Sequence, residues 1–413
     1  MSSIKRNIAA LTIVQLVSYL SPLLALPYLS RVLNVDSFGL VMLIIAILNI
    51  TMTFTDFGFN IFSAYWIAKN KNNKNRVALH LGSVFIIKFI LILICISLVY
   101  FYLYIFDNLS LSLELKNKLF IWISISILFL SYQPTWFFQG IEKMFNITLF
   151  MSASKLSYIL FVIFLVKNEN DISWVIASYS FSNMIASILG MYFIYKNGYY
   201  IRIPSYNFCI DVFKKSSQFF LSRVSVVLYT SANTFIVGNI GGLQQSAFYS
   251  SSEKIYQFGQ SLSAPISQAL FPHLVRTKEK RTLYKFVFTM LIPLTIGTSI
   301  IYYFAQDIIT LIFSTDFIDA TPTLRVLLIC IIVNFIGVNF GYPAFSIINR
   351  IDLANKTVIA GSLLQLVLIL FLYTNNLVSA YSIAVSVLIT EGFVMLSRII
   401  IYKHYSKKKH YEI

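Results

Sequence analysis

The sequence predicts an all-α integral membrane protein with about twelve transmembrane helices, and both its composition and its apolar runs support this. Of 413 residues, 58% are hydrophobic and 12% are charged, whereas a soluble domain carries about 25% charged residues. The hydrocarbon core of a bilayer is about 30 Å thick, so a spanning helix needs about 20 apolar residues. Apolar runs of this length follow one another along almost the whole chain. A lipid bilayer is therefore the expected solvent.

Polar breaks separate the apolar runs into individual spans. The expected spans are residues 8–30, 38–62, 82–106, 119–139, 147–166, 172–195, 215–238, 246–270, 284–305, 322–346, 357–374 and 377–402. The first span follows Lys5 and Arg6, as a secretory signal would. Its length and its prolines, Pro22 and Pro27, instead favour a retained helix without a cleavage site.

The basic residues predict the orientation of the chain in the membrane. Most of the 32 lysines and arginines fall in loops on the side of the two termini. The loops on the opposite side hold only Arg31, Lys116, Lys118 and Lys167. Because cytoplasmic loops are enriched in lysine and arginine, both termini are expected in the cytoplasm.

Several other classes of protein are disfavoured by the same pattern. The net charge of +16 comes from short loops, so no soluble basic domain is available to bind nucleic acid. The short outer loops leave no room for a catalytic domain. The four histidines fall in inner loops or the tail, the three cysteines form no CxxC pair, and no glycine-rich phosphate loop is recognisable. We therefore expect no enzyme activity, no nucleic-acid partner, no metal and no cofactor.

A polar, basic stretch near residue 205 divides the expected spans into two sets of six. It contains Lys196, Arg202, Pro204 and Lys214. We expect an N-terminal six-helix lobe over residues 1–205 and a C-terminal six-helix lobe over residues 206–413. An even number of helices in each half makes the halves parallel repeats, with a cavity between them.

Polar side chains inside the spans lie on stripes at helical spacing. Asn49, Thr53, Asp56 and Asn60 share one face of the second span, because residues three and four apart are neighbours on a helix. Span eight carries a similar stripe made of Ser250, Lys254, Gln257, Ser261 and Gln268. Lipid penalises such stripes, so they should face the protein interior or a hydrated cavity.

The charges inside the spans suggest the kind of cargo. Each costs about 2.5–3.5 kcal/mol at the middle of a helix, so their retention favours a function. Basic residues outnumber the acidic ones, which are Asp56, Glu253 and Glu391, and a cationic cavity suits an anion such as a phosphate or an acidic sugar. The candidate substrate-binding residues are Arg223, Lys254, Lys155, Lys88, Gln15 and Gln257.

Two carboxylates are candidate ion-coupling residues, Asp56 and Glu253. A carboxyl group in a low-dielectric site can take up a proton, because burial disfavours its charged form. Helix capping or packing by Asp56, and an ion pair between Glu253 and Lys254, are the structural alternatives. Arg325 and Arg398 lie about a turn from a span end and are expected to extend to the interface instead.

Short motifs along the chain resemble those of the bacterial Wzx-type O-antigen flippases. They are Asp36-Ser-Phe-Gly39, Thr53-Phe-Thr-Asp-Phe-Gly-Phe-Asn60, Tyr249-Ser-Ser-Ser-Glu-Lys-Ile-Tyr256 and Ala264-Pro-Ile-Ser-Gln-Ala-Leu-Phe-Pro272. The resemblance covers essentially the full length and places the chain in the multidrug/oligosaccharidyl-lipid/polysaccharide exporter superfamily. It implies alternating access and a multi-pass protein of the bacterial inner membrane that functions in lipopolysaccharide biosynthesis.

The same resemblance implies the partners of the protein. The cargo would be an undecaprenyl-diphosphate-linked oligosaccharide, moved from the cytoplasmic to the periplasmic leaflet, with membrane lipids, an O-antigen polymerase and a chain-length regulator as further partners. Two other functions stay open. One is an ion-coupled multidrug extruder of the same superfamily, which should have a more acidic and aromatic site. The other is a membrane glycan polymerase or ligase, which the short outer loops disfavour.

Overall fold

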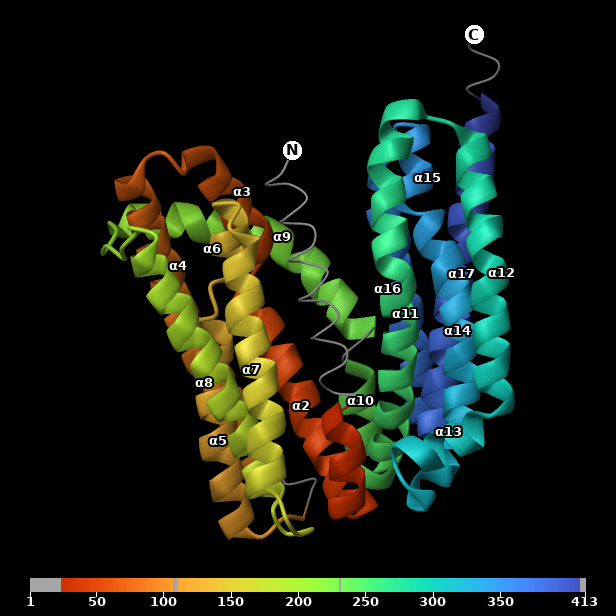
Figure 1. Ribbon diagram of the computed structural model, residues 1–413, viewed down its shortest axis with the longest axis horizontal. Coiled ribbons are helices and arrows are strands. Elements are labelled where there is room, and N and C mark those ends of the chain that lie inside the picture. The colour runs from red at the N-terminus through yellow and green to blue at the C-terminus, as the bar shows by residue number, and fades with distance from the viewer. Residues whose placement is uncertain (1–23, 107–109, 230–231, 409–413) are drawn as a thin grey trace. The chain divides into compact units, whose positions relative to one another are not determined.

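The computed structural model describes residues 24–106, 110–229 and 232–408, and every regular element in these ranges is a helix (Figure 1). The predicted all-α class is confirmed. Gln15 and most of the first predicted span lie outside the described residues.

The chain divides into two compact units, Met1–Val227 and Leu228–Ile413. The sequence placed the boundary at 205/206 instead. The α9 helix contributes to the first unit because Phe57 stacks on Phe213 and on Phe220, with ring centroids 4.7 Å apart in each pair. That the two units are the six-helix lobes of a transporter stays a prediction.

The first unit contains a series of long helices, of which two are interrupted and resume as shorter helices. Its elements are α2 (Val35–Asp56), α3 (Phe59–Asn70), α4 (Lys74–Phe101), a π-helical turn (Tyr102–Phe106), α5 (Leu113–Ser131), α6 (Thr135–Gly140), α7 (Met144–Leu165), α8 (Ile172–Lys196) and α9 (Tyr206–Tyr229). In this unit α8 packs against both α5 and α7 (Figure 1).

The second unit repeats much of this arrangement. Its elements are α10 (Ala232–Ile236), a π-helical turn (Val237–Gly241), α11 (Leu243–Thr277), α12 (Lys280–Tyr303), α13 (Ala305–Ile312), a 3-10 turn (Thr315–Ala320), α14 (Thr321–Asn339), α15 (Tyr342–Ile347), α16 (Asp352–Thr374) and α17 (Ala380–Lys408). Here α17 packs against both α14 and α16 (Figure 1). In packing, α14–α17 therefore correspond to α5–α8.

Two predicted spans of the first unit are broken helices rather than continuous ones. Residues 38–62 are interrupted between α2 and α3, where Phe57 and Gly58 have left-handed backbone angles of φ 44° and 82°. Residues 119–139 are interrupted between α5 and α6, just before Thr135. Pro134 has no N–H group to continue the hydrogen-bond ladder of α5. The α14–α15 interruption also has a proline close by, Pro343, in the first turn of α15.

The membrane character is well supported by the described helices. Eight helical segments among them are long and apolar enough to cross a bilayer. The α5 helix is not among the eight, because its first two turns contain Glu114, Lys116 and Lys118. The protein is therefore a multi-pass membrane protein, whereas the number of about twelve spans and the cytoplasmic termini stay predictions.

One histidine lies in a different place from the one predicted. His80, expected in an inner loop, lies within α4 and is fully buried. The helix begins at Lys74 rather than near residue 82, so that its polar first turns are included. The His80 ring stacks on Trp66, with centroids 4.3 Å apart, which indicates a packing role.

Candidate functional site

The clearest polar site in the first unit lies beside its two helix interruptions. A helix that stops inside a membrane leaves carbonyl groups without intrahelical partners, and these must be paired within the protein. The interruptions between α2 and α3 and between α5 and α6 bring such groups to one small cavity of about 50 Å³. Its lining residues are Met52, Thr55, Asp56, Asn60, Lys88, Leu130, Ser131, Gln133, Thr135, Trp136 and Met151. A buried water molecule needs roughly 10–15 Å³ of cavity volume. The cavity therefore has room for a few water molecules.

Lys88 reaches this cavity from α4. Its side chain is buried, and its ammonium group donates a hydrogen bond of 2.6 Å to the carbonyl oxygen of Ser131 at the end of α5. The carboxyl group of Asp56, also buried, is close enough to attract the ammonium group electrostatically. The C-terminal end of a helix carries partial negative charge, so a cation there stabilises it. Lys88 is thus the cap of the interrupted helix, a role the sequence did not predict.

Neutral polar side chains complete the site. The Ser131 hydroxyl donates to Thr55 Oγ1 at 2.8 Å, and the Thr135 hydroxyl donates to Asn60 Oδ1 at 3.1 Å. Gln133 donates to Asn183 Oδ1 at 2.8 Å. These contacts join α2, α3, α5, α6 and α8 around the interruption. The sequence singled out Asp56, Asn60 and Lys88 but not the hydroxyl and amide groups around them.

The second unit has a buried cation at the matching interruption. Arg398 on α17 donates from Nη1 to the carbonyl oxygen of Gly337 at 2.7 Å and from Nε to Thr357 Oγ1 at 3.0 Å. The expected extension to the interface is wrong, since only 7% of Arg398 is exposed. Arg398 is buried because the free carbonyl groups at the end of α14 offer it a hydrogen-bond partner inside the protein. The sequence does not reveal this partner.

The residues predicted in span eight lie near one another on α11. Lys254 is half-buried, and its ammonium group lies 3.4 Å from Gln257 Oε1. Glu253 is buried and accepts a hydrogen bond of 3.2 Å from Thr234 on α10. The carboxylate and the ammonium group of these two adjacent residues also attract each other. Glu253 therefore faces the interior of its unit.

A buried amide forms a separate polar cluster in the second unit. Gln365 on α16 donates to Asn233 Oδ1 at 3.2 Å and to Ser386 Oγ at 3.0 Å, and it accepts from Thr390 at 2.7 Å. This cluster joins α10, α16 and α17. Gln365 was not among the predicted site residues, because a lone glutamine in an apolar run gives no periodic signal.

The remaining predicted site residues are placed less completely. Lys155 lies on α7 and is half-buried. Arg223 lies on α9, but its side chain is outside the described part of the structure, as is the whole of Gln15. Each unit thus holds part of the predicted set, with Lys88 and Asp56 together in one unit and Lys254, Gln257 and Glu253 together in the other. Substrate binding and ion coupling by these residues stay predictions.

Sequence comparisons relate the chain to polysaccharide export. Residues 4–278 match a family described as polysaccharide biosynthesis protein. Two curated relatives, from Shigella dysenteriae and from Escherichia coli (strain K12), are each named "Putative O-antigen transporter". They are 25% and 28% identical over 65% and 67% of this chain. The aligned part spans about two thirds of each relative, 67% and 66% of its length.

Structural comparisons relate the fold to known transporters. An inward-facing multidrug resistance MATE family transporter of the MOP superfamily superimposes with a TM-score of 0.73 at 14% identity, covering 96% of this chain and 99% of the other. A MOP superfamily transporter from Pyrococcus furiosus, described as having a binding pocket of reversed polarity, gives 0.64 at 15% identity, with 98% and 96% covered. At such identities the similarity shows the fold alone, which is that of MOP transporters.

Proposed function

This chain belongs to the polysaccharide biosynthesis protein family, and on that premise we propose that it flips an undecaprenyl-diphosphate-linked oligosaccharide, the O-antigen unit, from the cytoplasmic to the periplasmic leaflet of a bacterial inner membrane. The resemblance to Wzx-type flippases is confirmed by this family match, by the names of the curated relatives and by the fold. The family match, over more than half of the chain, is the observation that carries the proposal.

The charges in the spans support an anionic cargo. Lys254 keeps part of its surface exposed, next to Gln257, which can bind hydroxyl groups. Arg223 and Lys155 add positive charge in α9 and α7. Lysine and arginine bind phosphate oxygens through charge-assisted hydrogen bonds, so we assign the diphosphate to these cations. Lys88 is the weakest candidate of the set, because its ammonium group already binds Ser131.

The proposed mechanism is alternating access of two lobes. The first unit forms one lobe, the second unit forms the other, and a cationic central cavity receives the diphosphate and the glycan. The polyprenyl tail stays in the bilayer. Asp56, which lines a small polar cavity of its own unit together with Lys88, is the proposed coupling carboxylate, and Glu253 is the second candidate.

Surface display of O-antigen in a strain that lacks its own transporter tests the proposal. Restoration by the wild-type chain is expected, and Arg223→Ala or Lys254→Ala should abolish it without loss of the protein from the membrane. Lys118→Ala is the matched control, because Lys118 forms an exposed pair with Glu114 at 2.6 Å. Normal display by both the Arg223 and the Lys254 variants would contradict their assignment. No display with the wild-type chain and a matching oligosaccharide would contradict the function itself.

A further inference from the structure

A cation that belongs to none of the sites described above lies near the start of α14. Arg325 is the only basic residue between Lys285 and Arg350. Its guanidinium group lies over the ring of Tyr302, 5.5 Å from the centroid. Its Nε atom is buried and has no hydrogen-bond partner among the described residues. The residue as a whole is half-buried, and a hydrogen-bond partner for the buried Nε atom would stabilise it, so Arg325 is suited to bind a ligand.

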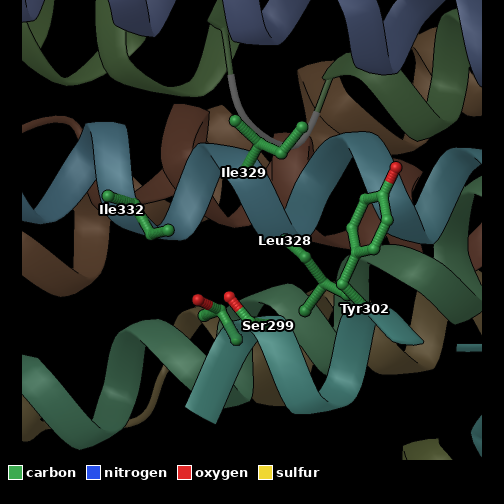
Figure 2. A pocket seen from close by; sticks show the side chains of 6 residues that line it. Ser299, Tyr302, Leu328, Ile329 and Ile332 are labelled. Carbon is green, nitrogen blue, oxygen red and sulfur yellow. The ribbon is translucent and has the colours of Figure 1, made fainter. Parts of the chain in front are cut away.

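A groove between α12 and α14 lies next to this cation, because the Tyr302 ring that Arg325 covers is one of its walls. It has a volume of about 130 Å³. Its lining residues are Thr298, Ser299 and Tyr302 from α12, and Leu328, Ile329 and Ile332 from α14. Figure 2 shows the Tyr302 ring and the Ser299 side chain rising from one helix toward the other. A neighbouring hollow of about 440 Å³ along α12 shares Ser299 with this groove.

Helical spacing places the cation at one end of the apolar part of the groove. Arg325, Leu328, Ile329 and Ile332 follow the spacing i, i+3, i+4, i+7 and so share one face of α14. The hydroxyl groups of Ser299 and Tyr302 lie on the facing helix. Thr298 uses its own hydroxyl to bond the carbonyl oxygen of Leu294 at 2.8 Å. The groove therefore has two hydroxyl groups and an apolar floor, with the Arg325 cation beside its Tyr302 wall.

The groove opens on a surface that lipid should cover. Only 11% of the most apolar stretch of α12 is buried within the protein. Ile296 and Ile300, which line the neighbouring hollow, are 56% and 54% exposed. In a multi-pass membrane protein such a surface faces acyl chains. The opposite end of α12 carries Lys280, Arg281 and Lys285, so the positive-inside rule assigns the Arg325 end to the outer leaflet.

We propose that this groove is a binding site for an anionic phospholipid of the outer leaflet. The phosphodiester accepts hydrogen bonds from Arg325, Ser299 and Tyr302, and an acyl chain lies on Leu328, Ile329 and Ile332. Arginine is suited to this role because its planar group of donors matches phosphate oxygens.

The charge balance around the cation favours a singly charged headgroup. The segment that joins α12 to α14 contains three carboxylates, Asp307, Asp316 and Asp319, and no basic residue. One arginine can neutralise one phosphodiester. A diphosphate would bring additional negative charge, and residues 286–349 contain no second basic residue to meet it. The groove therefore differs in charge from the proposed cargo site.

Native mass spectrometry of the purified full-length chain tests this site, with phosphatidylglycerol as the probe and diacylglycerol of the same acyl chains, which lacks the phosphodiester, as the comparison. Arg325→Gln should weaken phosphatidylglycerol binding about tenfold, toward the diacylglycerol level, because the charge-assisted hydrogen bonds to the phosphodiester are lost. Lys118→Gln, which removes an exposed cation paired with Glu114, should bind as the wild type does. Unchanged binding by Arg325→Gln, or an equal loss in both variants, would overturn the proposal.

A second variant keeps the test decisive if Arg325→Gln is poorly folded. Ile329→Trp retains the cation but fills the groove, and it should lose the rise in melting temperature that phosphatidylglycerol gives the wild-type chain. Full stabilisation of Ile329→Trp by phosphatidylglycerol would contradict the site. Undecaprenyl diphosphate serves as a competitor, and its displacement of phosphatidylglycerol at lower concentration would reassign the groove to the cargo lipid and overturn the phospholipid proposal. O-antigen display is a separate readout, so this test can fail without failure of the proposed function.

Discussion

The two units stabilise the same structural feature with different cations. In the first unit, Lys88 caps the end of α5 through the carbonyl oxygen of Ser131. In the second unit, Arg398 caps the end of α14 through the carbonyl oxygen of Gly337 and also binds Thr357. Both interrupted helices resume beside a proline, Pro134 or Pro343. A buried cation that caps an interrupted helix is thus a structural feature of both units and does not depend on the cargo.

The difference between the two cations suggests different roles for the two interruptions. Arginine is always charged and fixed by several hydrogen bonds, whereas lysine is a point charge whose protonation responds to burial. Lys88 also shares a cavity with Asp56, a second titratable group. We therefore expect the structure around the interruption in the first unit to change when protons or cations bind. The structure around the interruption in the second unit should stay the same.

The largest expected effect concerns the Asp56 carboxylate. Asp56→Asn keeps the shape of the side chain but removes its charge, so transport driven by a proton gradient should fall about tenfold or more, equal to at least about 1.4 kcal/mol in the barrier. Translocation in liposomes with and without a pH gradient measures this. Transport that remains equally responsive to the gradient would remove Asp56 from the coupling mechanism.

The next largest effect concerns the stability of the first unit. Lys88→Met removes the cap of α5 and leaves Asp56 buried without its cation, so the free energy of unfolding should decrease by about 3 kcal/mol. Lys71→Met is the matched control, because Lys71 pairs with Glu142 at 3.0 Å on the surface, and an exposed pair contributes about 0–1 kcal/mol. Denaturant unfolding in detergent compares the two, and equal losses would show that Lys88 is not a cap.

A smaller effect is expected when the cap of the second unit keeps its charge. Arg398→Lys retains the cation but cannot reach both Gly337 and Thr357, so the free energy of unfolding should decrease by about 1–2 kcal/mol. Thermal unfolding of the purified protein measures the change. A loss as large as that of Lys88→Met would indicate that the geometry of Arg398, rather than its charge, carries its contribution.

The smallest effect tests the hydroxyl network around the first interruption. Ser131→Ala removes the bond to Thr55 but keeps the backbone carbonyl group that Lys88 binds. The expected loss in the free energy of unfolding is about 1 kcal/mol, with the response to a proton gradient preserved. A lost response in this variant would place the Ser131 hydroxyl in the coupling mechanism.

The sequence predicted the class of fold well, because helix-length apolar runs have few interpretations. It also placed Asp56 and Asn60 on one polar face, and both line the same cavity. The two residues do not lie on one continuous helix as expected, because a left-handed turn at Phe57 and Gly58 separates them. Gly58 within the apolar run was the available signal for that turn.

The caps could not be predicted because they depend on pairs far apart in the chain. Lys88 and Ser131 are brought together only by the packing of α4 beside α5, and Arg398 and Gly337 by that of α17 beside α14. Depth within a span suggested that Arg398 would extend to the interface. A free carbonyl group inside the protein offered a nearer partner.

The proposed function is the movement of a diphosphate-linked glycan across the membrane. The most direct measurement reconstitutes the wild-type chain and Lys254→Ala in liposomes with an undecaprenyl-diphosphate-linked oligosaccharide on one leaflet. We expect the wild-type chain to carry the intact oligosaccharide to the other leaflet, and Lys254→Ala to do so only at the rate of empty liposomes. Formation of longer or transferred glycans without translocation, or a wild-type rate no higher than that of empty liposomes, would contradict the function. Equal rates above that level for both proteins would contradict only the role of Lys254.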